Sequence, residues 1–520
     1  MALQYNFIEM KKLNFILLLV VCTTACLGQQ LTLTGTVIGA AGHDSIEVNE
    51  SYDGNYWKNN SRYLKPDASG NFHESYISSV PKVITLIYKG HKQRLLLSSG
   101  RPLHVIIHAN APDNLFSFRG KAKAENDLLQ KLKLEDEGNL PFIKELKLKN
   151  SYATWSVDSI IYMKLPAIKN GLDSTHRVIQ QAHLPLSLEK VIAAEVKYFY
   201  ANGVSQNLGS RLNNRKNRSD FHTRFIETVW SYFTLPTKDE LNTNMSANAY
   251  LDNYFKFKLW KAMYVYRTDK HKEHADSVFR HNTGVAYKDL ENDPDRSNEV
   301  YLFSTRLKNM MPQYAWEKHL THLLHNFCMS GQLQSAAKLF NFIKANCTNS
   351  EYIKASEKVF SPLKKARDQY ASNLNIKITP DYRATSSLSA LLAPYKGKIV
   401  FIDMWGTWCP HCIEDIAFVP ALKERLKGKD IVFLYIARDE DKDDEVWRDF
   451  IFVNNITGEH VRKTADQIAN LWNELGVADS EQAYPYYLII DRSGKILVSN
   501  AKRLSDGDNL YHQLEMAINK

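Results

Sequence analysis

GKIVFIDMWGTWCPHC, residues 397–412, places two cysteines directly after a short apolar run. The run IVFIDMW is continuous rather than alternating, which is typical of a strand buried on both faces of a parallel sheet. The residues after Cys412, IEDIAFVPALKERL, carry a helical pattern. Cys409 therefore stands where a strand leads into a helix, and Pro410 suits the first helical turn, where its missing N–H costs nothing. Three hypotheses for the two cysteines follow: a redox-active dithiol, half of a metal site, or a structural crosslink.

A dithiol that exchanges disulfides needs one exposed sulfur of lowered pKa and a second sulfur within reach. The free N–H groups and the dipole of a helix N-terminus stabilise a thiolate at Cys409, and Cys412 follows within one turn. A metal site would need two further ligands, but Cys328 and Cys347 are far apart in helical sequence and form no second C-x-x-C. We expect these two to be buried thiols or one disulfide between helices. A crosslink closing so short a loop constrains the unfolded chain little, which disfavours a structural role.

The same stretch resembles the thioredoxin superfamily, and most closely its exported TlpA/ResA-type branch, over roughly residues 376–520. The resemblance implies that Cys409 attacks, that Cys412 resolves, and that Asp403 is the buried acid which takes and returns the proton of Cys412. It places Pro485, in AYPYYLIID, where the family has a cis-proline. It also implies a partner-binding surface and no dissolved cofactor beyond the Cys409–Cys412 disulfide. The residues expected on that surface are Trp405, Trp408, Tyr484 and Pro485.

The two residues between the cysteines, Pro410 and His411, depart from this branch, whose reductases more often carry Glu-Pro or Pro-Pro. Pro-His is the pair found in DsbA-like oxidases. A histidine here stabilises the thiolate, so the disulfide becomes a stronger oxidant. Glu414 and Asp415 place negative charge nearby and oppose that effect. The resemblance as a whole favours a reductase or isomerase, and an oxidase remains the alternative.

The rest of the chain divides into further segments that differ in their pattern of apolar and polar residues. Residues 29–115 hold short β-rich runs separated by turn clusters, which predicts a small antiparallel sandwich or barrel. This segment resembles the N-terminal β domain of exported thioredoxin-like proteins of the Bacteroidetes type. Residues 116–372 show helical spacing, and residues 373–520 form the thioredoxin-like domain. The predicted fold is thus multi-domain: β, then all-helical, then α/β.

The N-terminal residues 1–28 are expected to be a targeting segment. Lys11 and Lys12 precede an apolar run too short to span a bilayer and ending on small residues. Cleavage before Cys26 would give a lipid anchor, whereas cleavage after Gly28 would not, and both options stay open. The expected location is therefore the periplasm or cell envelope.

The charge distribution guides the choice of partners. Residues 375–520 carry 18 Lys and Arg against 22 Asp and Glu, whereas the whole chain has a net charge of +9. The basic excess, densest at residues 211–225, therefore lies away from the dithiol, and a nucleic-acid partner is not expected. The expected partners are cysteine-containing envelope proteins and a membrane or thioredoxin-like electron donor. A surface interaction protein, with the thioredoxin fold as scaffold, is the competing hypothesis from another functional class. The sequence predicts no oligomeric state.

Overall fold

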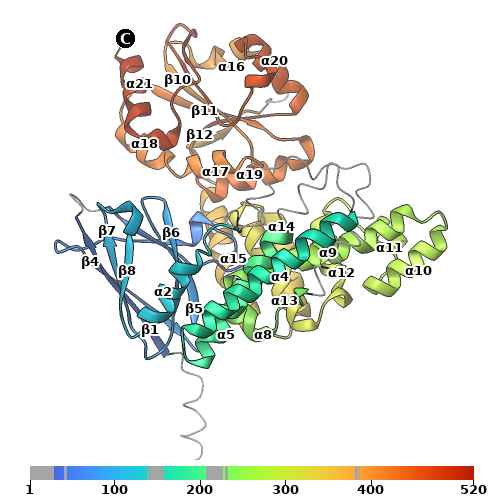
Figure 1. Cartoon of the computed structure of the whole chain (residues 1–520). Coiled ribbons are helices and arrows are strands. Elements are labelled where there is room, and N and C mark those ends of the chain that lie inside the picture. Colours follow the sequence, from blue (N-terminus) through green and yellow to red (C-terminus); the bar gives the residue numbers. More distant parts are fainter. Residues whose placement is uncertain are drawn as a thin grey trace, which may run out of the picture. The chain divides into compact units, whose positions relative to one another are not determined.

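The computed structural model describes residues 29–39, 44–137, 140, 157–205, 227–228, 232–380, 385 and 387–519. The chain divides into two compact units, with the boundary in the sequence between His319 and Leu320. The expected targeting segment with Cys26 and the basic stretch 211–225 lie outside the described residues. Figure 1 labels the elements along the chain.

The N-terminal unit begins with two four-stranded sheets, in the orders β4-β1-β7-β8 and β3-β2-β5-β6. Neighbouring strands pair antiparallel, except that β1 and β7 are parallel. Along β1, buried residues alternate with more exposed ones, as in a strand with one face on a core. Both sheets contribute to one apolar core, for example through Leu33 and Leu95. The strands are β1 (Gln29–Ile38), β2 (Ile46–Asn49), β3 (Ser61–Leu64), β4 (Asn71–Ser78), β5 (Lys82–Tyr88), β6 (His91–Leu97), β7 (Leu103–His108) and β8 (Phe116–Gly120).

Helices follow the two sheets in the same unit. A buried ion pair connects sheet and helices, because Arg94 of β6 donates to Glu195 of α5 and to Ser246 of α9. The helices are α2 (Lys123–Leu132), α4 (Val157–Gln181), α5 (Leu186–Gly203), α8 (Lys238–Thr243), α9 (Met245–Thr268), α10 (Lys272–Thr283), α11 (Tyr287–Glu291) and α12 (Glu299–Arg306), while α13 (Gln313–Met329) spans the border between the units.

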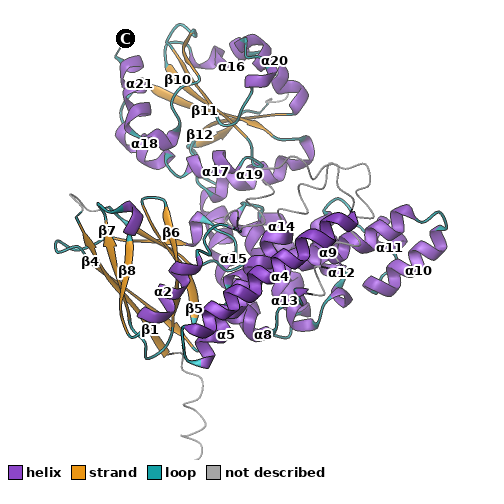
Figure 2. Ribbon diagram, in the orientation of Figure 1, coloured by secondary structure: helices purple, strands orange, loops and turns teal. Residues whose placement is uncertain are grey.

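The C-terminal unit is built on one six-stranded mixed sheet, in the order β14-β13-β10-β11-β12-β9. Strands β9 to β12 are parallel to one another, whereas β13 is antiparallel to β10 and to β14. Helices flank this sheet (Figure 2). The strands are β9 (Ile376–Ile378), β10 (Ile399–Trp405), β11 (Ile431–Arg438), β12 (Gly458–Lys463), β13 (Tyr486–Ile490) and β14 (Ile496–Ser499). The helices are α14 (Leu333–Asn346), α15 (Ser350–Tyr370), α16 (Leu388–Leu392), α17 (Pro410–Ile416), α18 (Val419–Arg425), α19 (Asp444–Val453), α20 (Ala465–Leu475) and α21 (Asp508–Ile518).

The predicted fold class is confirmed: strand sheets come first, helices fill the middle, and a thioredoxin-like α/β domain ends the chain. The single helix predicted after Cys412 is two helices, α17 and α18, and Pro420 lies in the first turn of the second. Cys328 and Cys347 are both buried, and they do not form a disulfide with each other.

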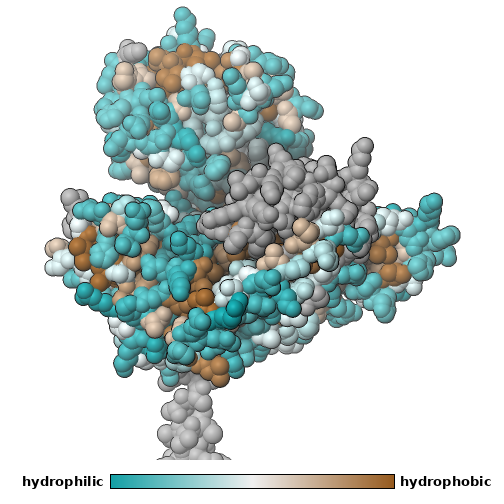
Figure 3. Space-filling model, viewed as in Figure 1, coloured by the Kyte–Doolittle hydropathy of each residue, from teal (hydrophilic) through white to brown (hydrophobic). Residues whose placement is uncertain are grey.

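Among the described residues, every helix is too short or too polar to cross a membrane. The face shown in Figure 3 is mostly hydrophilic, with apolar residues in scattered patches.

Candidate active site: a disulfide at the carboxyl edge of the sheet

The two cysteines lie where β10 ends and α17 begins. All seven residues of β10 are buried, and Cys409 is the N-cap of α17, with Pro410 in the first helical turn. Cys409 and Cys412 form a disulfide, and the Cys412 N–H donates to Cys409 Sγ at 3.1 Å. Cys409 is only 3% exposed and Cys412 2% exposed. The exposed sulfur that disulfide exchange requires is therefore not seen in this oxidised form.

Asp403 lies on β10 and is 2% exposed. Burial raises its pKa well above the ordinary value, and the charge of Asp415 adds to that effect. Strand register places it between Tyr435 of β11 and Tyr487 of β13. Its Oδ1 receives no hydrogen bond from the described residues. A carboxyl group of this kind holds a proton at a pH where an ordinary Asp has lost it, and so suits proton exchange with a thiol.

The polar row continues one strand further, to His460 of β12. His460 is paired in register with Tyr435, and the two rings stack with centroids 4.9 Å apart. His460 Nε2 donates to the Ile456 carbonyl at 2.6 Å, since a carbonyl can only accept. Burial lowers the pKa of His460 to about 3, so the ring stays neutral.

His411 and Glu414 face solvent on the same side of α17. Their side chains are 67% and 58% exposed, and His411 Nδ1 lies 3.4 Å from Glu414 Oε2. The imidazole is thus beside the carboxylate that was expected to oppose its influence on the dithiol.

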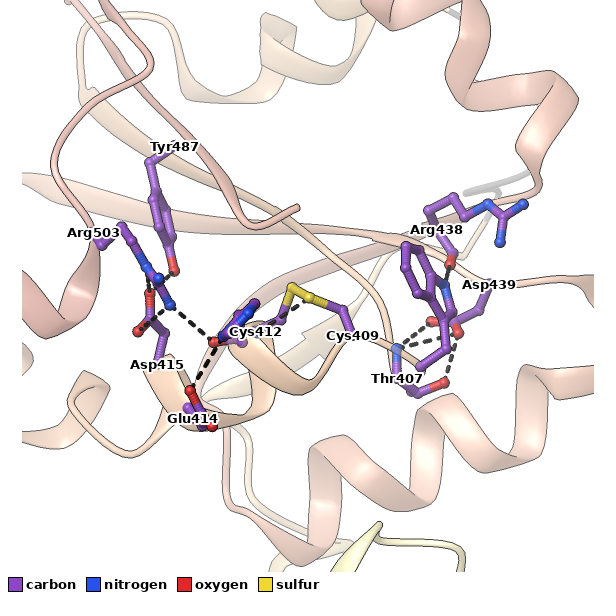
Figure 4. The surroundings of a disulfide bond; sticks show 11 residues. Thr407, Cys409, Cys412, Glu414, Asp415, Arg438, Asp439, Tyr487 and Arg503 are labelled. Carbon is purple, nitrogen blue, oxygen red and sulfur yellow. Dashed lines mark hydrogen bonds and ion pairs between the residues drawn. A yellow bond between two sulfur atoms is a disulfide. The ribbon is translucent and has the colours of Figure 1, made fainter. Parts of the chain in front are cut away.

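Asp415, in contrast, is buried and has two partners from distant parts of the chain (Figure 4). Arg503 Nε and Nη2 each donate to its carboxylate at 3.0 Å, and the Tyr487 hydroxyl donates at 2.9 Å. Arg503 Nη2 also donates to the His411 carbonyl at 3.3 Å. The negative charge of Asp415 is therefore compensated by Arg503, a partner that was not predicted from the sequence.

Three of the four residues expected on a partner surface lie near one another at the same edge of the sheet. Trp408 is 50% exposed and meets the Tyr484 ring edge-on, with centroids 5.3 Å apart. The Tyr484–Pro485 bond is cis. Trp405 is different: it is 1% exposed and packs against Phe450, because it is the last residue of a wholly buried strand. Its assignment to the surface is wrong.

Two residues that follow β10 and β11 were not predicted as part of the site. Thr407 and Asp439 are hydrogen-bonded to each other, and Figure 4 shows them on the side of the disulfide opposite Arg503. Asp439 could have been found, because the first polar residue after a buried parallel strand lies at the carboxyl edge of the sheet, where sites form. Arg503 gives no such signal.

Comparisons with known proteins agree with this geometry. The sequence model of the Redoxin family matches residues 376–513. The thiol-disulfide oxidoreductase ResA of Bacillus thuringiensis subsp. konkukian is 25% identical over 129 residues, which cover 25% of this chain and 66% of ResA. For ResA of Bacillus anthracis the identity is 29% over 106 residues, covering 20% and 56%. The alignments thus span less than two thirds of either relative.

Solved structures also give matches to part of this chain. The thioredoxin domain of a thiol-disulfide oxidoreductase from Bacteroides vulgatus is 23% identical, with a TM-score of 0.22, and the match covers 25% of this chain and 84% of that one. A putative thiol:disulfide interchange protein DsbE from Chlorobium tepidum is 21% identical, with a TM-score of 0.20, covering 24% and 84%. The C-terminal unit contains a thioredoxin-like domain, and residues 376–513 within it match the sequence model of the Redoxin family.

Proposed function

We propose that the protein is a thiol–disulfide oxidoreductase that exchanges disulfides with cysteine-containing proteins. The observation that carries the proposal is the Cys409–Cys412 disulfide at the start of α17, with a buried acid, Asp403, on the strand that leads to it. Similarity to ResA supports the same class of reaction. The redox-active disulfide is the only cofactor that this chemistry requires.

In the reducing direction, the Cys409 thiolate attacks one sulfur of the partner's disulfide. A Cys409–partner bond forms, and the other partner sulfur leaves with the electron pair as a thiolate. Asp403 then takes the proton of Cys412, whose thiolate attacks Cys409 Sγ. The Cys409–Cys412 bond forms, the mixed disulfide breaks, and the second partner sulfur leaves as a thiolate. The protein is thereby oxidised and the partner reduced by two electrons.

The proposed location is the cell envelope, with cysteine-containing envelope proteins as substrates and a membrane or thioredoxin-like protein as electron donor. The expected targeting segment, with or without lipid at Cys26, supports this location. We place the protein in the reductase or isomerase direction. The exposed pairing of His411 with Glu414 supports that choice, because the carboxylate offsets the imidazole charge that would favour an oxidase.

Equilibration of the full chain with reduced and oxidised glutathione tests both the activity and its direction. A potential near or below about −250 mV is expected for a reductase, whereas a value near −120 mV would mean an oxidase. A Cys409→Ser variant is the control for glutathione reactions at other cysteines. A Cys409–Cys412 pair that glutathione can neither reduce nor re-form would refute the proposed activity.

A further inference from the structure

Asp439 holds the segment that leads to the nucleophilic cysteine. It follows β11 directly and is 2% exposed. Its carboxylate accepts hydrogen bonds from Thr407, which lies two residues before Cys409. The Thr407 N–H lies 3.2 and 3.3 Å from its two carboxylate oxygens, and the Thr407 hydroxyl donates to Oδ1 at 2.6 Å (Figure 4). One buried carboxylate thus accepts hydrogen bonds from both donors of Thr407, its main-chain N–H and its hydroxyl.

Adjacent residues attach the same segment to the end of β11. Trp408 Nε1 donates to the Arg438 carbonyl at 2.6 Å, and the Arg438 guanidinium lies 5.3 Å from the Trp408 ring centroid. A Cβ on Gly406 would lie 2.5 Å from Trp408 Nε1 and 3.0 Å from the Arg438 carbonyl oxygen, so the close approach needs glycine. The Cys409 N–H donates to the Gly406 carbonyl at 3.1 Å, which completes a tight turn.

Resting on the proposed function, we propose that Asp439 is a positioning residue: its carboxylate keeps Cys409 in the reactive geometry by holding Thr407. Cys409 can accept the Cys412 N–H only if the turn places it at the N-cap of α17. That hydrogen bond stabilises a thiolate. Losing the Thr407 contacts therefore raises the pKa of the Cys409 thiol.

The hydrogen bonds between Thr407 and Asp439 depend on pH, because the Asp439 carboxyl group can be protonated. Burial raises the pKa of Asp439 to about 6, against the two Thr407 hydrogen bonds, which lower it. Asp443 raises this pKa further and Arg462 lowers it. A protonated carboxyl carries a donor on one oxygen and is a weaker acceptor than a carboxylate, so the hold on Thr407 weakens below about pH 6.

Other groups around Asp439 are already paired. Arg462, 0% exposed, donates to the Asp439 main-chain carbonyl at 2.7 Å and pairs with Asp441 and Asp444. Burial raises the pKa of the Tyr484 phenol; of the nearby charges, Arg438 lowers this pKa and Asp439 raises it. Asp439 is therefore the carboxylate that binds Thr407, while Asp441 and Asp444 bind Arg462.

Iodoacetamide alkylation of Cys409 in the reduced full chain tests the inference, with rates measured by peptide mass spectrometry between pH 4.5 and 9.5. In Asp439→Asn we expect the alkylation rate of Cys409 to rise at a pH about one unit higher than in wild type. The rate at neutral pH is then lower by about tenfold. The rates of wild type and variant should converge as the pH falls from about 6 toward 4.5, because Asp439 is then itself protonated. Thr407→Val, which loses only the hydroxyl bond, should shift the profile in the same direction by less.

Asp449→Asn is the matched control, because Asp449 is also a buried Asp and pairs with Arg367 of α15 at 2.7 Å rather than with Thr407. Its profile should coincide with that of wild type. If Asp439 were only a nearby negative charge, Asp439→Asn would make Cys409 more reactive. A faster rate, an unchanged profile, or an equal loss in Asp449→Asn would each overturn the inference. Failure of the proposed function is distinct: wild-type Cys409 would then titrate no lower than a free cysteine, near pH 8.5.

Discussion

Replacing Arg503 by Met should destabilise the C-terminal unit, because it leaves the buried Asp415 carboxylate without a cation. Arg503 supplies two hydrogen bonds of 3.0 Å to this carboxylate, which is 1% exposed. Removing one partner of a fully buried pair costs about 3–5 kcal/mol. The Arg503 side chain is 41% exposed, and Tyr487 still donates to Asp415 in the variant. We therefore expect a smaller loss, about 2 kcal/mol.

The assay is a double-mutant cycle of Arg503→Met and Asp415→Asn, measured by urea unfolding of the oxidised full chain. The transition that shifts when the disulfide is reduced reports the C-terminal unit. The coupling energy between the two residues should be about 2 kcal/mol.

A matched control pair is Arg425 and Asp508, whose N···O distance is 2.7 Å and whose side chains are 43% and 80% exposed. The two arginines are similarly exposed, whereas Asp415 is 1% and Asp508 80% exposed, and Arg503 makes two hydrogen bonds where Arg425 makes one. Coupling in the control cycle should stay below about 0.5 kcal/mol. Equal coupling in the two cycles would refute the claim that burial of Asp415 gives the Arg503 contact its energy.

Three further predictions concern other groups of the same unit. The pKa of His460 falls from 6.5 to about 3 on folding, so its contribution to stability is present above pH 6.5 and is lost as the pH falls toward 3. Unfolding free energies of wild type and His460→Gln should therefore converge by up to about 5 kcal/mol over that range, and a pH-independent difference would contradict this. Asp403→Asn should slow the second, Cys412-dependent release of thionitrobenzoate from Ellman's reagent at least about 100-fold and leave the first release unchanged; stopped-flow traces with an unaltered second phase would exclude Asp403 as the base. Burial raises the pKa of Cys328 to about 12, so iodoacetamide at pH 8 should modify it only after denaturation, and mass spectrometry of the native protein would reveal any exception.

The centre of the site could be predicted from sequence because its parts are contiguous. Strand, turn, Cys409, Pro410 and the helix follow one another, and Asp403 lies on the same strand. The position of Trp405 in this contiguous stretch also explains why its assignment to the partner surface was wrong. It ends a continuous apolar run, and a strand buried on both faces buries its last residue as well.

The surroundings of the site could not be read from local patterns. Arg503 is 88 residues from Asp415, in an ordinary polar loop, and only the folded sheet brings them together. Strand β12 was not predicted, because its buried residues include His460, Arg462 and Lys463, which hide the apolar pattern. Polar residues buried with specific partners are where hydrophobic periodicity fails as a guide.

Trapping of a mixed disulfide is the sharpest test of Cys409 as the attacking sulfur. The full chain with Cys412→Ser, which keeps Cys409 but cannot resolve, is incubated with a disulfide-bonded protein such as insulin and analysed on a non-reducing gel. We expect Cys412→Ser to form a covalent adduct through Cys409 that a reductant cleaves, and Cys409→Ser to form no adduct. No adduct with Cys412→Ser, or equal adducts from both variants, would contradict the assignment of Cys409 as the attacking sulfur of a thiol–disulfide oxidoreductase.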